Sequence, residues 1–362
     1  MAKSYGSLHP QVYEFDNLYR AYERARRDKR YRPDVLRFGG RLGENLLTLQ
    51  EELHSLAWRP GPYQLRVIQE PKERIIRIAP FRDRVVHQAI CSVVAPLFER
   101  SFIHDSYACR KGKGTHAALD RLTSFLRRSN SAFVLNADLR KFFDSISHQV
   151  LLGELERKLS DRSVRSLLAR IVDSYTSDTN LPGLFHPHGM PIGNLTSQWF
   201  ANIMGNLLDR FVKQELCCHG YVRYMDNFLL LSDEKARLRD WCARIETFLA
   251  GIGLVLNPKT IIAPTSGGVP FLGFLVFADH RRVLRANVVR GRRHMRAICR
   301  SMEHGQMAPE EGALRIQSWF AHLSHGDTYQ LRNRLAEESA AYLEVTSCSL
   351  STVSTPASRA TS

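Results

Sequence analysis

The sequence predicts an α+β fold in which a mixed or antiparallel sheet, built around β-hairpins, packs on helices. In residues 220–231 two β-rich runs flank a polar pair, which places Asp226 and Asn227 at the tip of a hairpin. A second hairpin signature covers residues 65–78, and helical runs occupy much of the remaining chain. With 362 residues, the chain is long enough for two or three packed units.

The remaining elements follow from periodicity and turn residues. Lys72 and Arg74 lie at the bend of the first hairpin, and a strand over residues 132–137 ends at Asp138. Helices are expected over residues 16–30, 38–56, 85–97, 117 onward, 151–175, 199–216, 233–249 and most of 285–343, and short strands over 254–259 and 269–277. The Ser/Thr-rich residues 346–362 lack an apolar period and are expected to be disordered.

The chain is strongly basic, with 51 Lys and Arg against 36 Asp and Glu. Such an excess favours a polyanionic partner, because phosphate neutralisation supplies most non-specific affinity for nucleic acids. A merely basic protein is the alternative, but the cations are clustered. Those we expect to contact nucleic-acid phosphates are Arg110, Lys111 and Lys113 in a glycine-containing loop, and Arg290, Arg292, Arg293 and Arg296 in a helical region.

Nothing in the sequence predicts a membrane span or a signal peptide, so we expect a cytoplasmic protein. The seven cysteines have no C-x-x-C spacing, which favours reduced thiols. Cys217, Cys218 and His219 are adjacent, but without a second ligand pair they do not predict a zinc site.

Asp138 and Asp226 are the carboxylates with the strongest functional pattern. One follows directly after a strand and the other lies at a hairpin tip, where a side chain is accessible and held rigidly. Hard divalent cations prefer such oxygen ligands. The alternatives are a helix N-cap for Asp138, a role that Ser145 or Ser147 would fill better, and an ordinary surface turn for Asp226.

The order of these motifs resembles the fingers and palm of reverse transcriptases. R-I-I-R-I-A-P-F-R-D-R, S-Y-A-C-R-K-G-K-G-T-H, A-D-L-R-K-F-F-D, Y-M-D-N and F-L-G-F follow one another as the blocks of that family do, over roughly residues 60–345. The resemblance implies a right-hand polymerase. Its expected parts are an N-terminal helical extension (1–60), fingers and palm (61–280), a helical thumb (281–345) and the tail (346–362).

The resemblance also implies roles for single residues. Asp138 and Asp226, helped by the Leu139 carbonyl, would hold two Mg²⁺ ions, for which Mn²⁺ can substitute. Lys72 and Arg74 would contact the triphosphate of a dNTP. Phe143 would lie under the sugar and exclude a 2′-hydroxyl, and Lys259 would approach the leaving pyrophosphate. The alternatives are core packing for Phe143 and solvated turns for the three cations.

The loop before the helix at residue 199 departs from most of the family. Ile192 replaces a glutamine and Gln198 follows Ser197 where the family has proline; Gly193 lets the backbone approach a ligand. This pattern resembles reverse transcriptases of diversity-generating retroelements, in bacteria and phages. That resemblance implies error-prone copying of template RNA through an RNA/DNA duplex, with a small basic helical-bundle accessory protein as partner.

Asn227 stands where the family motif has a second aspartate, and it leaves two alternatives open: an active polymerase with an atypical metal site, or a catalytically impaired palm that acts as an RNA-binding assembly subunit. A related reverse transcriptase of an antiphage defence system is a further alternative, because such relatives share the palm blocks. A group II intron maturase is disfavoured at this stage, because no long extension follows residue 345 and the loop at residues 192–198 differs.

Overall fold

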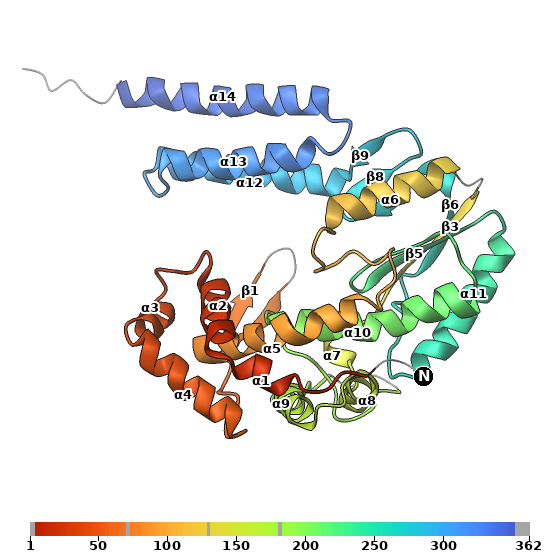
Figure 1. Cartoon of the computed structure of the whole chain (residues 1–362). Coiled ribbons are helices and arrows are strands. Elements are labelled where there is room, and N and C mark those ends of the chain that lie inside the picture. The colour runs from red at the N-terminus through yellow and green to blue at the C-terminus, as the bar shows by residue number, and fades with distance from the viewer. Residues whose placement is uncertain (1–3, 70–72, 129–130, 180–182, 352–362) are drawn as a thin grey trace, which may run out of the picture. The chain divides into compact units, whose positions relative to one another are not determined.

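The chain divides into two compact units. The computed structural model describes residues 4–69, 73–128, 131–179 and 183–351 (Figure 1). Unit 1 comprises residues 1–114 and 133–263, and unit 2 comprises residues 115–132 and 264–362. This division differs from the expected boundary at residue 280, because the helix that follows the glycine-containing loop packs on a strand of the C-terminal part.

Unit 1 contains most of the helices and the larger sheet. Its helices are α1 (His9–Tyr13), α2 (Phe15–Arg26), α3 (Pro33–Gly39), α4 (Leu42–His54), α5 (Phe81–Glu99), α7 (Phe142–Ser145), α8 (His148–Lys158), α9 (Arg162–Asp173), α10 (Leu195–Arg210), the π-helical η1 (Phe211–Glu215) and α11 (Lys235–Ala250). Its strands are β1 (Gln64–Ile68), β2 (Arg74–Ile78), β3 (Phe133–Asp138), β4 (Tyr221–Tyr224), β5 (Asn227–Ser232) and β6 (Ile261–Pro264), whose last residue belongs to unit 2.

The larger sheet has the strand order β4-β5-β3-β6. Its central strand β5 is buried along nearly its whole length, which agrees with its continuous apolar run at residues 228–231. Helix α11 packs on β3 and β5, and α10 packs against α5 and α8 (Figure 1). The sheet and these helices share one hydrophobic core, which fixes the ends of β3 and β4 in place.

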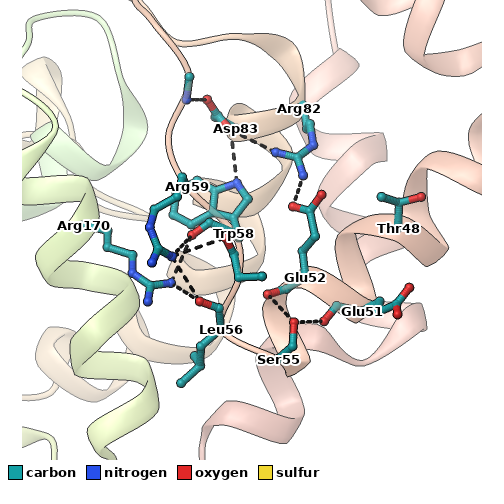
Figure 2. A network of polar contacts seen from close by, with 12 residues as sticks. Thr48, Glu51, Glu52, Ser55, Leu56, Trp58, Arg59, Arg82, Asp83 and Arg170 are labelled. Carbon is teal, nitrogen blue, oxygen red and sulfur yellow. Dashed lines mark hydrogen bonds and ion pairs between the residues drawn. The ribbon is translucent and has the colours of Figure 1, made fainter.

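A buried polar network attaches the N-terminal helices to the start of α5 (Figure 2). The Trp58 indole donates a hydrogen bond of 3.2 Å to one oxygen of Asp83, and the Gly61 amide donates one of 2.7 Å to the other. From α9, Arg170 donates to the carbonyl oxygens of Leu56 and Trp58 at 2.5 and 3.0 Å. Residues 4–60 are therefore an integral part of unit 1 and pack on its core.

Unit 2 is a helical unit with a small three-stranded sheet. Its elements are α6 (Thr115–Arg128), the 3-10 turn η2 (Thr265–Gly267), β7 (Val269–Phe271), β8 (Phe274–Val276), β9 (Arg281–Val283), α12 (Arg285–Glu303), α13 (Pro309–Leu323) and α14 (Tyr329–Ser351). Helix α12 packs against both α13 and α14 around Met295, Cys299, Leu323 and Leu335. Arg281 donates to Asp120 at 2.7 Å and thereby ties the sheet to α6.

Several predicted element boundaries are wrong. Residues 151–175 form two helices, because Ser147 caps α8 and Asp161 caps α9 by accepting from the backbone N–H of Val164. Residues 254–259 form a turn with one bridge at Leu256, since Pro258 has no N–H for a strand ladder.

Helix α14 extends through Ser351, whereas disorder was expected from residue 346 onward. Extending a formed helix adds one hydrogen bond per residue, so the Ser/Thr-rich segment continues the helix begun before it. Residues 352–362 lie outside the described part. No helix in the described ranges is both long and apolar enough to cross a membrane.

Candidate active site

The β4–β5 hairpin presents Asp226 at its turn. Tyr224 pairs with Asn227, so the two turn residues are Met225 and Asp226. The expected tip, Asp226 with Asn227, is therefore wrong by one residue: Asn227 is the first residue of β5. Met225 has a φ of 60°, the positive value that a tight two-residue hairpin turn requires at its first central position.

Pairing of β3 with β5 brings the two predicted carboxylates together. Asp138 lies opposite Asn227, and the Leu139 amide donates a 3.0 Å hydrogen bond to the Asp226 carbonyl. Burial raises the pKa of the Asp226 carboxyl, and the neighbouring charge of Asp138 raises it further. Arg74 and Arg223 act in the opposite direction on that pKa. The site is therefore a repelling acidic pair near cations.

These residues fit a hard divalent cation. A cation would relieve the repulsion between Asp138 and Asp226, and both supply the carboxylate oxygens that Mg²⁺ prefers. The side-chain Oδ1 of Asn227 is buried and has no hydrogen-bond partner among the described residues. No three His, Cys, Asp or Glu side chains gather as a metal-binding group in the described ranges, so a cation here would rely on two carboxylates and on water or substrate oxygens.

Asn257 holds Asp138 in place, a role that the sequence analysis missed. Its side-chain Nδ2 donates a 3.0 Å hydrogen bond to Asp138 Oδ2, and its backbone N–H donates one of 2.7 Å to the Asp138 carbonyl. Its Oδ1 accepts from the backbone N–H of Lys259 at 3.1 Å. The Asn-Pro dipeptide at residues 257–258 signalled this turn, but not its contact with β3. The Lys259 side chain is exposed beside this turn.

Beneath the hairpin turn lies a buried ion pair. The Arg223 guanidinium donates to both carboxylate oxygens of Asp209 on α10, at 2.6 and 2.7 Å. It also donates to the Met225 carbonyl at 2.9 Å, directly at the turn. A Cβ at Gly205 would collide with this guanidinium, so the glycine makes room for it. The pair thus joins the hairpin carrying Asp226 to helix α10.

Residues 192–194, which directly precede α10, dock on the β1–β2 hairpin; the expected start of this helix at residue 199 is wrong, because α10 begins at Leu195. The Arg77 amide on β2 donates a 3.0 Å hydrogen bond to the Ile192 carbonyl. Asn194 accepts from the Ala79 amide at 3.2 Å and donates to the Arg77 carbonyl at 3.1 Å. Gly193, with a φ of 115°, approaches Ile76 so closely that a Cβ would lie 2.5 Å from its Cγ2 atom. Asn194 is a second positioning residue that the sequence analysis missed.

The other residues predicted to bind a nucleotide differ in how far they are exposed. Phe143 is half-buried with its ring edge-on to Phe142 at 5.9 Å, and its carbonyl accepts from the Met190 amide. Gln198 is half-buried in the first turn of α10, and Arg74 is exposed at the start of β2. Lys72 lies outside the described residues. Contact of these residues with a nucleotide stays a prediction.

The predicted nucleic-acid contacts differ in accessibility. Arg110 is taken up internally: it donates to Glu99 at 2.7 Å and to the carbonyls of Ile103 and Ser106, and its side chain is 6% exposed. The expected phosphate contact is therefore wrong for Arg110. Lys111 is exposed, whereas Lys113 donates to the His104 carbonyl.

The arginines of α12 lie in unit 2. Arg292 forms an ion pair of 2.6 Å with Glu338, whereas Arg290, Arg293 and Arg296 are exposed. This helix therefore presents cations to solvent, as a phosphate-binding surface requires.

The chain matches the family model of the reverse transcriptase (RNA-dependent DNA polymerase) over residues 69–276, more than half of its length. Protein YkfC of Escherichia coli (strain K12) is 29% identical over 290 residues, 69% of this chain and 75% of that protein. The group II intron-encoded protein LtrA of Lactococcus lactis subsp. cremoris is 23% identical over 47% of this chain and 28% of that protein. An apo telomerase structure from Candida tropicalis covers 66% of this chain and 60% of its own, with 13% identity and a TM-score of 0.48.

The chain thus spans less than a third of LtrA. The family match includes both carboxylate strands, residues 192–198 and Asn257. The expected right-hand polymerase fold, mixing helices with antiparallel sheet, is confirmed. The chain belongs to the reverse transcriptase family.

Proposed function

We propose that the chain is an RNA-directed DNA polymerase that extends a primer with dNTPs on an RNA template. The observation that carries this proposal is the pairing of β3 with β5, which brings Asp138 and Asp226 together at the ends of two inner strands of the sheet. In a family of template-directed polymerases, such a pair is suited to hold divalent cations. Bound there, two Mg²⁺ ions would neutralise charge on the attacking and leaving oxygens during phosphoryl transfer.

The residues around the pair would position the substrates. The hydrogen bond from Asn257 restricts rotation of the Asp138 carboxylate and so fixes its orientation towards a bound cation. Arg74 would bind the triphosphate, together with Lys72, and the exposed Lys259 would approach the departing pyrophosphate. Phe143 would contact the sugar of the incoming nucleotide and disfavour a 2′-hydroxyl. In this proposal Asn227 keeps an oxygen beside the metals, without the charge of a second aspartate.

Primer extension on an RNA template with Mg²⁺ and dNTPs tests the polymerase proposal. The chain as given should extend the primer, and Asp226→Ala should lower the rate at least about a hundredfold, because metal ligation contributes several kcal/mol to the barrier. Asp233→Ala is the matched control, since Asp233 is an exposed carboxylate just after β5. If only Asn227→Asp extends, the chain is an inactivated palm; if neither does, the polymerase proposal is wrong.

We further propose the diversity-generating role, supported by Ile192 just before α10 and Gln198 in the first turn of that helix. In such a role the polymerase would misincorporate opposite template adenines, because the apolar Ile192 offers no amide to the incoming nucleotide. Sequencing the cDNA of the chain beside Ile192→Gln tests this: the substitution should reduce errors at adenines. An unchanged error spectrum would instead favour the antiphage alternative, whose polymerase need not be error-prone.

Similarity to LtrA supports a second candidate, a protein that acts with a group II intron RNA. Binding to a structured intron RNA, compared with an unrelated RNA of equal length, distinguishes this candidate. A large preference for the intron RNA would support it, whereas equal binding would leave the template-copying proposal in place.

A further inference from the structure

Unit 1 contains a cleft of about 330 Å³ towards the C-terminal end of α10, and neither carboxylate of the acidic pair lines it. Its walls come from the C-terminal parts of α5, α8 and α10, and from Tyr5. Helix α10 has 16 residues and is therefore about 24 Å long. Ile203, Asn206 and Arg210 of this helix line the cleft, whereas residues 192–194 precede its first residue.

The cleft has more positive than negative charge. Arg100, Lys158 and Arg210 line it, and none of them has a carboxylate partner among the described residues. Glu154 is the one carboxylate in the lining, and it is paired with Arg157, a fourth cation. Burial lowers the pKa of the Lys158 ammonium, and the nearby Arg210 lowers it further. Lys158 and Arg210 therefore repel each other, and the one carboxylate of the lining is paired with Arg157.

The other wall of the cleft is apolar and contains a buried amide. The Lys158 ammonium lies 5.2 Å from the ring centroid of Phe98 and donates to the Ser101 hydroxyl at 2.7 Å. Ile203 belongs to the same lining. Asn206 is 8% exposed, and its Oδ1 has no hydrogen-bond partner among the described residues. A buried polar atom without a partner is costly, so a ligand that satisfies this amide would be stabilised.

We propose that this cleft binds a nucleotide through its phosphate, either as a free nucleotide or as the 5′ end of an RNA strand. A phosphate monoester carries about −1.5 to −2 charge at pH 7, which matches several crowded cations better than a single carboxylate does. The apolar wall accommodates a base or sugar, and the Asn206 amide supplies a hydrogen bond. The volume lies at the small end of the range of about 300–1,000 Å³ for ligand sites.

Protection of Lys158 from acetylation tests the proposal directly. The Asp226→Ala chain is labelled with an N-hydroxysuccinimide acetate in EDTA, which removes metal-dependent binding at the acidic pair and makes the result independent of polymerase activity. The probes are AMP, adenosine, a 5′-phosphorylated RNA hexamer and the same hexamer without the phosphate. Saturating AMP or phosphorylated hexamer should slow Lys158 labelling about tenfold, with exposed Lys235 on α11 as the internal control.

The source of the phosphate follows from which probe protects. Protection by AMP and by the phosphorylated hexamer indicates any nucleotide phosphate, and protection by the hexamer alone indicates an RNA end; both support the proposal. Equal effects of AMP and adenosine, equal effects of the two hexamers, or protection by neither phosphate probe would overturn it.

Substitution of Arg210 provides the matched binding measurement. Arg210→Gln should weaken binding of the protecting probe about tenfold, because a charge-assisted contact to phosphate is lost. Arg239→Gln, an exposed arginine of α11 outside the cleft, should leave the dissociation constant unchanged. Equal affinity of the two variants would contradict the assignment even if Lys158 were protected.

Discussion

At the scale of single residues, Arg223 connects the stability of unit 1 to the shape of the candidate active site. Its side chain is 1% exposed and its partner Asp209 is fully buried. Desolvation disfavours the charged guanidinium, but the charge of Asp209 and its hydrogen bonds prevail, so the pKa of Arg223 is raised. The ion pair is stabilised because the Arg223 guanidinium donates hydrogen bonds to both Asp209 oxygens and to the Met225 carbonyl.

We predict that Arg223→Met lowers the free energy of unfolding by about 3–5 kcal/mol, because it leaves the Asp209 charge buried without its partner. The matched control is Arg237→Met, since Arg237 forms only exposed pairs with Asp233 and Glu234 and should contribute less than about 1 kcal/mol. Urea unfolding of both variants measures the difference. Similar midpoints for the two would show that the buried pair does not stabilise the turn.

The same residues show the limit of sequence reasoning. Asp138 and Asp226 could be predicted because each lies at the end of a β-rich run, a local pattern. The Arg223–Asp209 pair and the contact of Asn257 with Asp138 could not, because each joins two different elements and depends on how these pack. Arg110 was misassigned for the same reason: its charge was visible in the sequence, but its pairing with Glu99 on α5 was not.

At the scale of elements, α5 contains a buried histidine whose protonation at acidic pH would destabilise the fold. His87 is 2% exposed, and neither ring nitrogen has a hydrogen-bond partner among the described residues. Burial lowers its pKa to about 4, from an ordinary value of 6.5. The folded state therefore favours the neutral ring, and the stability this contributes is present above pH 6.5 and lost as the pH falls towards 4.

We predict that acidification from pH 7 to 4.5 destabilises the chain by about 2–3 kcal/mol more than it destabilises His87→Leu. The substitution removes the proton-binding group and keeps an apolar side chain of similar size. Urea unfolding at both pH values measures this difference, with the exposed His219→Leu as control. An equal pH response of the chain and His87→Leu would exclude His87 as the cause.

The docking of residues 192–194 on β2 depends on Gly193. We predict that Gly193→Ala breaks the hydrogen bond from the Arg77 amide, because the added Cβ would clash with Ile76 and the positive φ strains alanine. Faster hydrogen exchange at the Arg77 amide would report this change. Gly153→Ala on α8 is the control: a Cβ there meets nothing within 4 Å, so helix propensity should stabilise it by up to about 1 kcal/mol.

The elements themselves were predictable to different degrees. Hairpins and amphipathic helices follow from local periodicity, and β4–β5 and α11 were found near their predicted positions. The hairpin turn was misplaced by one residue, because apolar Met225 adopts a positive φ that sequence preference assigns to Asn, Asp or Gly. Helix α6 belongs to unit 2 because of its tertiary contacts, and no local sequence pattern predicts these contacts.

At the scale of the whole molecule, the net charge of +15 predicts RNA binding that weakens steeply with salt. The exposed arginines of α12 should contribute phosphate contacts, so Arg293→Gln together with Arg296→Gln should reduce the slope of log affinity against log salt by about 2. Filter binding of an RNA duplex over a salt series measures the slope. A slope equal to that of Arg239→Gln would place these arginines outside the RNA interface.

The register of β3 with β5 determines where this chain can accept insertions without separating its two carboxylates. Asp138 and Asp226 are 88 positions apart, yet six consecutive cross-strand pairs fix their approach. Within these strands a single-residue insertion would turn every later side chain to the opposite face and separate the carboxylates. An insertion in an exposed loop between the strands leaves the pairing intact. The acidic pair is therefore protected by a short ladder, while exposed loops of the intervening segment can lengthen and acquire new specificities.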